Sequence, residues 1–240
     1  MKELFFSFPL SDKCLAITTT TELGNMAYQV DEGNNVLLHR YQLSEALDID
    51  IKKFTYVHQH HSDLMEKVNE EDIGKGKDTF EDGLDCDALY TLIKGTPLCI
   101  FHADCVPIFF IDETRDLVGI IHAGFKGTMK HVAFKAVRRV IENEGLDIKN
   151  LKFYIGPYRM PCSFEVDEES KKQIIESGFE ETIIGGHFDN GLANKLDLYK
   201  LGVKDEQIRC ANIDTVSDDR CFSAYQKTPV GRMVSLIVLK

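Results

Sequence analysis

The chain has 240 residues, 43% of them hydrophobic, and its formal net charge at pH 7 is -11. It is long enough to bury a substantial core. The acidic balance argues against a nucleic-acid or anionic-membrane surface, because both require a basic footprint, and it indicates a small-molecule partner.

The 7 cysteines are spread through the chain. A chain of this size does not need disulfides, and the odd number suits reduced thiols, so we expect a cytoplasmic protein. The apolar run at 4–10 is interrupted by Ser11, Asp12 and Lys13, which predicts an early strand and not a signal peptide. No apolar run approaches the roughly 20 residues that span a bilayer.

Short apolar runs rich in β-branched and aromatic residues predict strands. In chain order these runs cover 54–58, 98–101, 106–111, 117–122, 151–155 and 234–239. After the first run, the segment 70–83 is rich in Glu, Asp, Lys and Gly, which predicts an exposed loop.

Helical spacing of apolar residues predicts helices over 128–144, 168–177 and 192–201. Gly145 is expected to end the first helix, and Asp167 is placed to cap the second. The mixed order of strands and helices predicts an α/β (α+β) fold: a single domain over 1–240, with mixed β-sheets layered with helices.

A cysteine and a histidine stand at the ends of two neighbouring apolar runs. Cys105 ends the stretch FHADC at 101–105, and His122 lies in IHAGFKGT at 121–128. Upstream, VHQHHSD at 57–63 offers a third soft ligand. Two His and one Cys suit a zinc ion with an open coordination position, whereas a structural zinc usually has four protein ligands. A zinc ion with an open position acidifies a bound water and makes it a nucleophile.

Several of these residues have an ordinary structural alternative. Cys99 and Cys210 lie in apolar runs and are expected to be core residues, and Cys105 alone would often be one too. The imidazoles of His58 and His60 are expected to be solvated or hydrogen-bonded, and the role of His102 is left open. Asp104 either orients a ligand imidazole or caps the following turn.

An anion site is expected beside His122. Gly124 and Gly127 permit a tight turn, and 127–130 would present free N–H groups at the start of the predicted helix. Lys126 adds a positive charge, which suits phosphate or a substrate carboxylate, although it also fits a surface lysine. The Walker spacing is absent. Arg40 and Arg232 are further candidates for substrate binding, although such arginines are usually salt-bridged or solvated.

Four motifs together resemble the YfiH/laccase-domain family of purine nucleoside phosphorylases. They are HADCVP at 102–107, IHAGFKGT at 121–128, YIGP at 154–157 with FEV at 164–166, and TPVGRM at 228–233. They run in the family's order from about Lys53 to the end of the chain. The family pattern Q-x-H selects His61, and its A-D-C and H-A-G select Cys105 and His122.

This resemblance implies a cytoplasmic α/β fold with mixed sheets and a zinc ion, or copper, held by His61, Cys105 and His122. It implies phosphorolysis of adenosine, inosine and S-methyl-5'-thioadenosine, with adenosine deaminase activity as a companion. Cys105, His122 and Asp104 are then the expected catalytic residues. The substrate partners would be a purine nucleoside and phosphate, the phosphate held by Lys126.

Other functions fit the same residues. Cys105 and His122 could form the thiolate–imidazole pair of a cysteine hydrolase, for example in editing peptidoglycan precursors. A copper-dependent polyphenol oxidase is a second alternative, although only His58-Gln59-His60 among the 8 His has the H-x-H form. A non-catalytic zinc-binding protein is a third, against which the lack of a fourth ligand argues.

Overall fold

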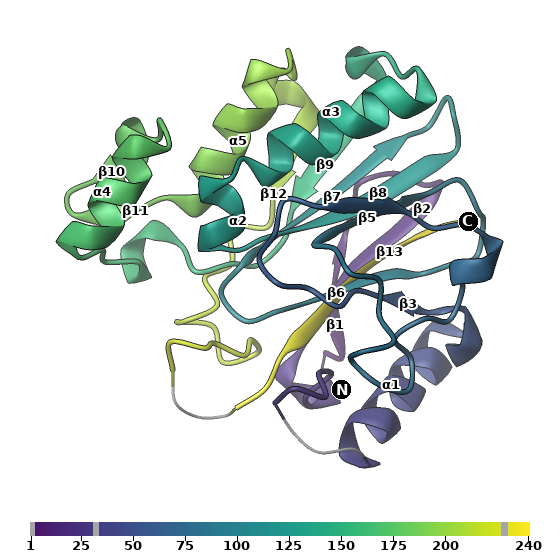
Figure 1. Cartoon of the computed structure of the whole chain (residues 1–240). Helices are drawn as coiled ribbons and strands as arrows, with labels where there is room; N and C mark the ends of the chain where they lie inside the picture. Colours follow the sequence, from purple (N-terminus) through teal and green to yellow (C-terminus); the bar gives the residue numbers. More distant parts are fainter. Residues whose placement is uncertain (1–2, 31–33, 227–229) are drawn as a thin grey trace.

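Two mixed β-sheets lie face to face at the centre of the fold (Figure 1). The computed structural model describes residues 3–30, 34–226 and 230–240. The first sheet has 5 strands in the order β1 (Phe5–Phe8), β2 (Cys14–Thr19), β13 (Met233–Leu239), β6 (Leu98–His102) and β3 (Thr55–Tyr56). Its neighbouring strands are antiparallel except for the parallel pair of β3 and β6.

The second sheet carries the strands that frame the candidate site. Its 6 strands follow the order β12 (Ile208–Cys210), β9 (Leu151–Ile155), β7 (Val106–Asp112), β8 (Leu117–Ala123), β5 (Ala88–Thr91) and β4 (Met65–Lys67). The two outer pairs are parallel and the inner pairs are antiparallel. A separate hairpin pairs β10 (Ile183–Ile184) with β11 (His187–Phe188).

Apolar side chains from both sheets fill the space between them. Phe8 of the first sheet lies with its ring centroid 5.4 Å from that of Phe109 in the second, and Ile100 and Ile120 belong to the same cluster. Strands β7 and β8 are buried along their whole length because helices cover their other face. This explains why their sequences are continuous apolar runs without polar alternation.

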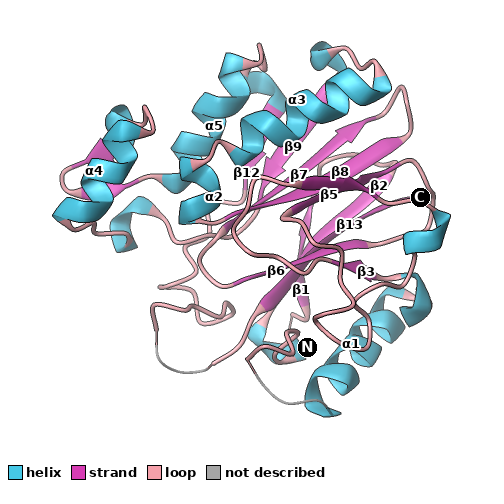
Figure 2. Ribbon diagram, in the orientation of Figure 1, coloured by secondary structure: helices cyan, strands magenta, loops and turns pink. Residues whose placement is uncertain are grey.

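Helices cover both outer faces of the stacked sheets (Figure 2). The helices are α1 (Asn34–Leu47), α2 (Phe125–Met129), α3 (Val132–Glu144), α4 (Glu168–Glu176) and α5 (Asn190–Lys200). Helices α3 and α5 pack on the second sheet, and Leu43 of α1 packs on the first. Helix α4 belongs to a smaller cluster with β11 and α5. The expected fold class, a single α/β domain with mixed sheets and helical layers, is confirmed.

Most predicted strands agree with the structure to within a residue or two. Predicted strand 54–58 is shorter, since only Thr55–Tyr56 pair as β3 and Val57 makes an isolated bridge to Leu84. The early apolar run forms β1, and segment 70–83 contains no β-strand. Asp167 caps α4 as expected, accepting a 2.8 Å hydrogen bond from Ser170 N. Helix α5 starts at Asn190, two residues earlier than the predicted 192.

The helix expected over 128–144 is divided. His131 adopts the left-handed region with φ 62°, which ends α2 and lets α3 start at Val132. The His131 ring is held by Asp197 of α5, whose carboxylate lies 2.8 Å from Nδ1. Gly145 ends α3 in the left-handed conformation, as predicted. No helix among the described residues is long and apolar enough to cross a membrane.

Candidate metal centre

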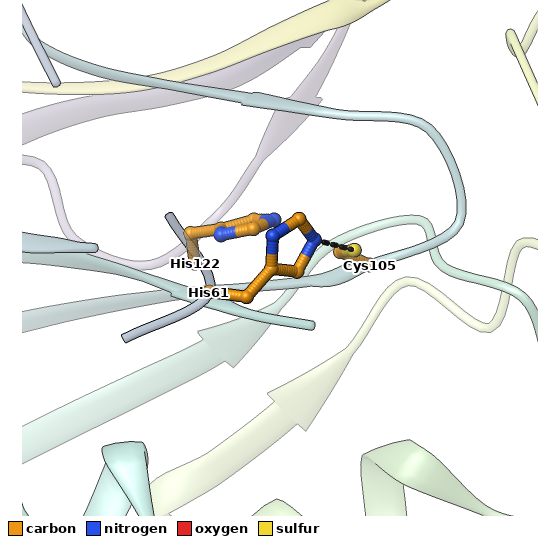
Figure 3. Close-up of side chains that lie close together, drawn as sticks. All are labelled: His61, Cys105 and His122. Atoms are coloured by element: carbon orange, nitrogen blue, oxygen red, sulfur yellow. Dashed lines mark hydrogen bonds between the residues drawn. The ribbon is translucent and has the colours of Figure 1, made fainter. Parts of the chain in front are cut away.

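Three side chains with metal-binding atoms converge where β7 begins and β8 ends. Cys105 immediately precedes β7, and His122 is the penultimate residue of β8. The antiparallel register pairs Val106 with Ala123, so Cys105 and the end of β8 meet at one sheet edge. His61 reaches them from the loop after β3, and the ligand atoms of the three residues lie within 4.8 Å of one another (Figure 3).

Gly124 leaves the space that His61 and Cys105 occupy. A Cβ atom on Gly124 would lie 2.4 Å from His61 Cδ2 and 3.0 Å from Cys105 Sγ. With the glycine in place, Cys105 Sγ and His61 Nε2 approach to 3.8 Å. The glycine of the HAG motif is therefore required by the packing of these side chains and not by an unusual backbone angle, since its φ is -74°.

Asp87, which the sequence analysis did not identify, organises two of the three ligands. Its buried carboxylate lies 2.8 Å from His122 Nδ1 and accepts a hydrogen bond from His61 N at 3.0 Å. Its other oxygen accepts from both the N–H and the hydroxyl of Ser62 at 2.6 Å. The carboxylate thus fixes the His61 backbone and the orientation of the His122 ring at the same time.

Gln59 anchors the same loop from the opposite side. Its side-chain amide exchanges two hydrogen bonds with the backbone of Phe101 in β6, at 2.7 and 2.9 Å. Its Nε2 also lies 3.3 Å from His122 Nε2. The glutamine of the Q-x-H pattern therefore binds the loop to the first sheet, while Asp87 binds it to the second.

Charge in the centre favours a thiolate. Burial would raise the pKa of Cys105, but the neighbouring His122, together with hydrogen bonds from His122 and His61, lowers it to about 6. Burial works against protonation of His122, yet Cys105 and Asp87 raise its pKa to about 9. Burial also opposes ionisation of Asp87, whereas the hydrogen bonds from His122 and Ser62 hold its pKa at about 2.

This donor set fits a zinc or copper ion. Zinc binds thiolate sulfur and imidazole nitrogen, and three protein ligands leave a coordination position for water or substrate. Asp87 contacts Nδ1 of His122. A metal-binding imidazole commonly has such a carboxylate partner on the nitrogen that does not bind the metal. His61, at φ 56°, and Asp104, at φ 85°, both adopt a conformation that is rare for residues other than glycine. Backbone strain of this kind clusters at functional sites.

The carboxylate in contact with the His122 imidazole is that of Asp87, not that of Asp104. Both Asp104 carboxylate oxygens are already used, one by the Thr215 hydroxyl at 2.7 Å and the other by Tyr225 N at 2.9 Å. Asp104 O also accepts from Arg159 N at 2.9 Å. Asp104 therefore ties three later positions, Arg159, Thr215 and Tyr225, to the chain next to Cys105.

Two of the N–H groups expected to be free at 127–130 are already bonded within the chain. Because α2 starts after Gly124, Thr128 N donates to Gly124 O and Lys130 N donates to Gly127 O. Lys126 is exposed in α2 and makes no ion pair among the described residues. The charge of Lys126 remains available to an anion, and the helix N-terminus beside it is that of α2, which starts at Phe125 and not at Gly127.

The contacts of Arg40 do not support substrate binding. Its guanidinium is fully buried and donates to the backbone oxygens of Met26, Gly76 and Lys77. It also lies 4.1 Å from the centroid of the Tyr56 ring. Arg40 therefore holds the 76–77 loop and α1 together.

Arg232 is half-buried beside the strand pair of β6 and β13. Its Nη1 donates to Gly231 O at 2.8 Å, and its backbone N donates to Asn25 Oδ1. No carboxylate pairs with its guanidinium among residues 3–30, 34–226 and 230–240. Arg232 keeps its charge available for an anion. Thr228 and Pro229 of the TPVGRM motif lie outside the described residues.

The remaining candidates have separate environments. His102 is buried in β6 and shares a 2.8 Å hydrogen bond with Ser235 Oγ. Burial lowers the pKa of His102 to about 3, which keeps this ring neutral. Cys99 is a buried core residue as expected, and Cys210 is partly buried at the end of β12.

The chain is similar to known proteins over most of its length. The family described as multi-copper polyphenol oxidoreductase laccase matches residues 17–240. Purine nucleoside phosphorylase YlmD of Bacillus subtilis (strain 168) is 28% identical over 220 residues, covering 88% of this chain and 79% of that protein. Purine nucleoside phosphorylase YlmD of Staphylococcus aureus is 30% identical over 226 residues, covering 89% of this chain and 83% of that protein.

Solved structures share the whole fold. The hypothetical protein YfiH of Bacillus licheniformis superposes with a TM-score of 0.93 at 27% identity, covering 100% of this chain and 97% of that one. YlmD of Geobacillus stearothermophilus gives a TM-score of 0.89 at 26% identity, covering 100% and 98%. The motif resemblance is thereby confirmed: the chain belongs to the multi-copper polyphenol oxidoreductase laccase family, together with YfiH and YlmD.

Proposed function

We propose that the chain is a metal-dependent purine nucleoside phosphorylase that acts on adenosine, inosine and S-methyl-5'-thioadenosine and also deaminates adenosine. The observation that carries the proposal is the convergence of His61, Cys105 and His122 beside Gly124. Similarity to two proteins named purine nucleoside phosphorylase over 88% and 89% of the chain supports the reaction class.

The protein's own residues would prepare the centre for catalysis. A bound zinc ion would supply a Lewis acid, with copper as the alternative metal. Asp87 accepts a hydrogen bond from the Nδ1–H of His122, which leaves the Nε2 lone pair directed away from the carboxylate and towards Cys105 and His61. Cys105 binds as the thiolate, the form that its low pKa favours.

Phosphate is the second substrate of the proposed reaction. Lys126 is the first candidate to hold it, because the lysine is exposed two residues after Gly124 and is not neutralised by an ion pair in the described chain. Arg232 is the second, because its guanidinium also lacks a carboxylate partner there. Binding of phosphate in line with ribose C1′ would make its attack effectively intramolecular as the purine departs.

A chromatographic assay tests this proposal. The purified protein is incubated with adenosine, inosine or S-methyl-5'-thioadenosine, with and without inorganic phosphate. We expect release of the base and of the ribose 1-phosphate product only when phosphate is present, and inosine from adenosine as the product of deamination. Release of the base at the same rate with and without phosphate would instead indicate hydrolysis. Absence of turnover with every purine nucleoside would contradict the proposal.

One observation favours a second function, that of a cysteine hydrolase. The mutual shifts of Cys105 and His122, with pKa values near 6 and 9, correspond to a thiolate–imidazolium pair, which is the arrangement of cysteine nucleophiles. The two functions respond oppositely to metal removal. A chelator should abolish phosphorolysis, whereas a hydrolase reaction that uses a free Cys105 thiolate should persist or increase.

A further inference from the structure

A second group of metal-binding side chains lies on the same loop as His61 but outside the centre already described. His60 Nε2 is 3.3 Å from His58 Nδ1 and 2.9 Å from Asp85 Oδ1, and His58 Nδ1 is 3.9 Å from the same carboxylate oxygen. We propose that His58, His60 and Asp85 form a second site for a divalent transition-metal ion such as Zn²⁺.

The spacing of the three atoms suits such an ion. Ligand atoms at tetrahedral angles around zinc, with bonds of about 2.0–2.1 Å, are roughly 3.3–3.4 Å apart. The observed separations of 3.3, 2.9 and 3.9 Å lie on both sides of this value, so each pair needs a shift of only about 0.6 Å or less. Side-chain rotation is enough to provide that shift.

The backbone brings the ligands together from two segments. Val57 and Leu84 form a parallel bridge, His58 N donates to Leu84 O at 2.6 Å, and Leu84 N donates to Tyr56 O at 3.0 Å. This pairing places Asp85 beside His58. Gly83 permits the close approach, since a Cβ there would lie 2.7 Å from His58 N. Main-chain hydrogen bonds therefore hold the two segments that carry the three side chains next to each other.

The imidazoles are held as well. The His58 ring packs edge-on against Phe80, with centroids 4.4 Å apart, and against His60, with centroids 4.2 Å apart. His60 N donates to Asp87 Oδ2 at 3.2 Å, so the network that fixes His61 also fixes the backbone of His60. The two sites share one loop and one anchor, but they use different side chains.

Charge and exposure set the kind of ion. No lysine or arginine pairs with Asp85 among the described residues, so the two imidazoles are the groups that its carboxylate pairs with there. Imidazole ligands favour transition ions such as Zn²⁺ and Cu²⁺ over Mg²⁺ and Ca²⁺. The His60 and Asp85 side chains are 51% and 73% exposed, which leaves positions for water and predicts weaker, exchangeable binding than at the centre around the buried His122.

Cobalt titration of the metal-depleted protein tests the proposal, with Co²⁺ alone as the probe. The first equivalent should give the near-ultraviolet thiolate-to-cobalt absorption expected for Cys105. A second, weaker equivalent should add visible cobalt absorption without increasing the thiolate band. Asp85→Asn combined with His60→Ala should remove only the second equivalent, whereas Cys105→Ser should remove the first equivalent together with its thiolate band.

Two variants serve as matched controls. Asp82→Asn removes an exposed carboxylate from the same loop, and His187→Ala removes a histidine elsewhere; both should still bind two equivalents. A wild-type protein that binds one equivalent would overturn the proposal. Retention of the second equivalent in the Asp85→Asn, His60→Ala variant, with its circular dichroism spectrum unchanged, would also overturn it. None of these readouts depends on the proposed enzyme activity.

Discussion

Asp87 and His122 are joined by two hydrogen bonds, one through side chains and one through the backbone. The carboxylate lies 2.8 Å from His122 Nδ1, and His122 N donates to Asp87 O at 2.7 Å. The second bond follows from sheet register, because Ala88 pairs with Ile121 across β5 and β8. The orientation of a proposed metal ligand is thus set by the strand pairing of the core.

Replacing Asp87 with Asn should weaken metal binding without removing any ligand. The amide cannot accept all the bonds that the carboxylate accepts from His122, His61 and Ser62, so the two histidines lose their fixed orientation. We expect metal affinity to fall on the order of ten- to a hundredfold, as for other carboxylates behind metal-binding histidines. Competition with a chromophoric chelator measures this change. Unchanged affinity in Asp87→Asn, with Asp82→Asn as the matched control, would contradict the role assigned to Asp87.

Gly124→Ala should damage the centre while leaving the fold intact. The backbone of Gly124, at φ -74° and ψ 167°, accepts alanine, but the new Cβ would displace His61 or Cys105. Metal content should therefore fall with little loss of secondary structure. Gly178→Ala is the complementary control: its φ of +78° is strained for alanine and its surroundings are open, so stability should fall by about 1–2 kcal/mol with full metal content. Full metal content in Gly124→Ala together with loss of metal from Gly178→Ala would contradict this explanation of Gly124.

Lys126→Met tests the proposed phosphate contact. Charge-assisted contacts contribute about 1.5–3 kcal/mol, so the phosphate KM should rise on the order of ten- to a hundredfold. Metal content should not change, and Lys130→Met, which removes another exposed lysine nearby, should behave as wild type. If phosphate dependence is intact in Lys126→Met, the anion is held elsewhere and Arg232 becomes the residue to replace. If Lys126→Met fails to fold, Lys126 is needed for the fold and the phosphate role assigned to it is wrong.

The change of stability with pH should include a contribution from Glu144. A hydrogen bond from Lys67, at 2.8 Å, lowers the pKa of Glu144 below its ordinary 4.5, and the Tyr90 hydroxyl donates to the same oxygen at 3.0 Å. A carboxyl whose folded pKa is depressed contributes stability above its unfolded pKa and loses that contribution as pH falls through the folded value.

Glu144→Gln should therefore be less stable than wild type at neutral pH, and the difference should shrink in acid. Denaturant titrations at neutral pH and below the ordinary carboxyl pKa measure both differences. Glu142→Gln is the control, because Glu142 lies on the same helix and forms only an exposed pair with Arg138. A difference that does not change with pH would contradict the assigned ion pair.

The sequence was informative where the signal was local. Cys105 and His122 stand at the ends of unbroken apolar runs, and strand pairing brings such ends together. Asp87 was missed because it directly precedes β5, a strand of only 4 residues that follows a polar loop. No local pattern in the sequence predicts that strand. Its carboxylate is bonded to Ser62 and His122, which lie 25 and 35 positions away in the sequence.

Two other differences also have long-range causes. The break between α2 and α3 depends on His131, whose ring is held by Asp197 of a helix formed much later in the chain. Arg40 carries a charge that suggested substrate binding, but its burial results from Tyr56 and from the 76–77 backbone. Neither contact follows from spacing or composition, because each joins segments that only the folded topology places together.

The most direct test of the proposed centre is metal analysis of single-residue variants of the purified protein. We expect about one tightly bound zinc or copper ion per wild-type chain. His61→Ala, Cys105→Ser and His122→Ala should each lose this ion, whereas His60→Ala should keep it, because His60 lies outside the set formed with Cys105. Full metal content in His61→Ala together with loss of the ion in His60→Ala would contradict the assignment.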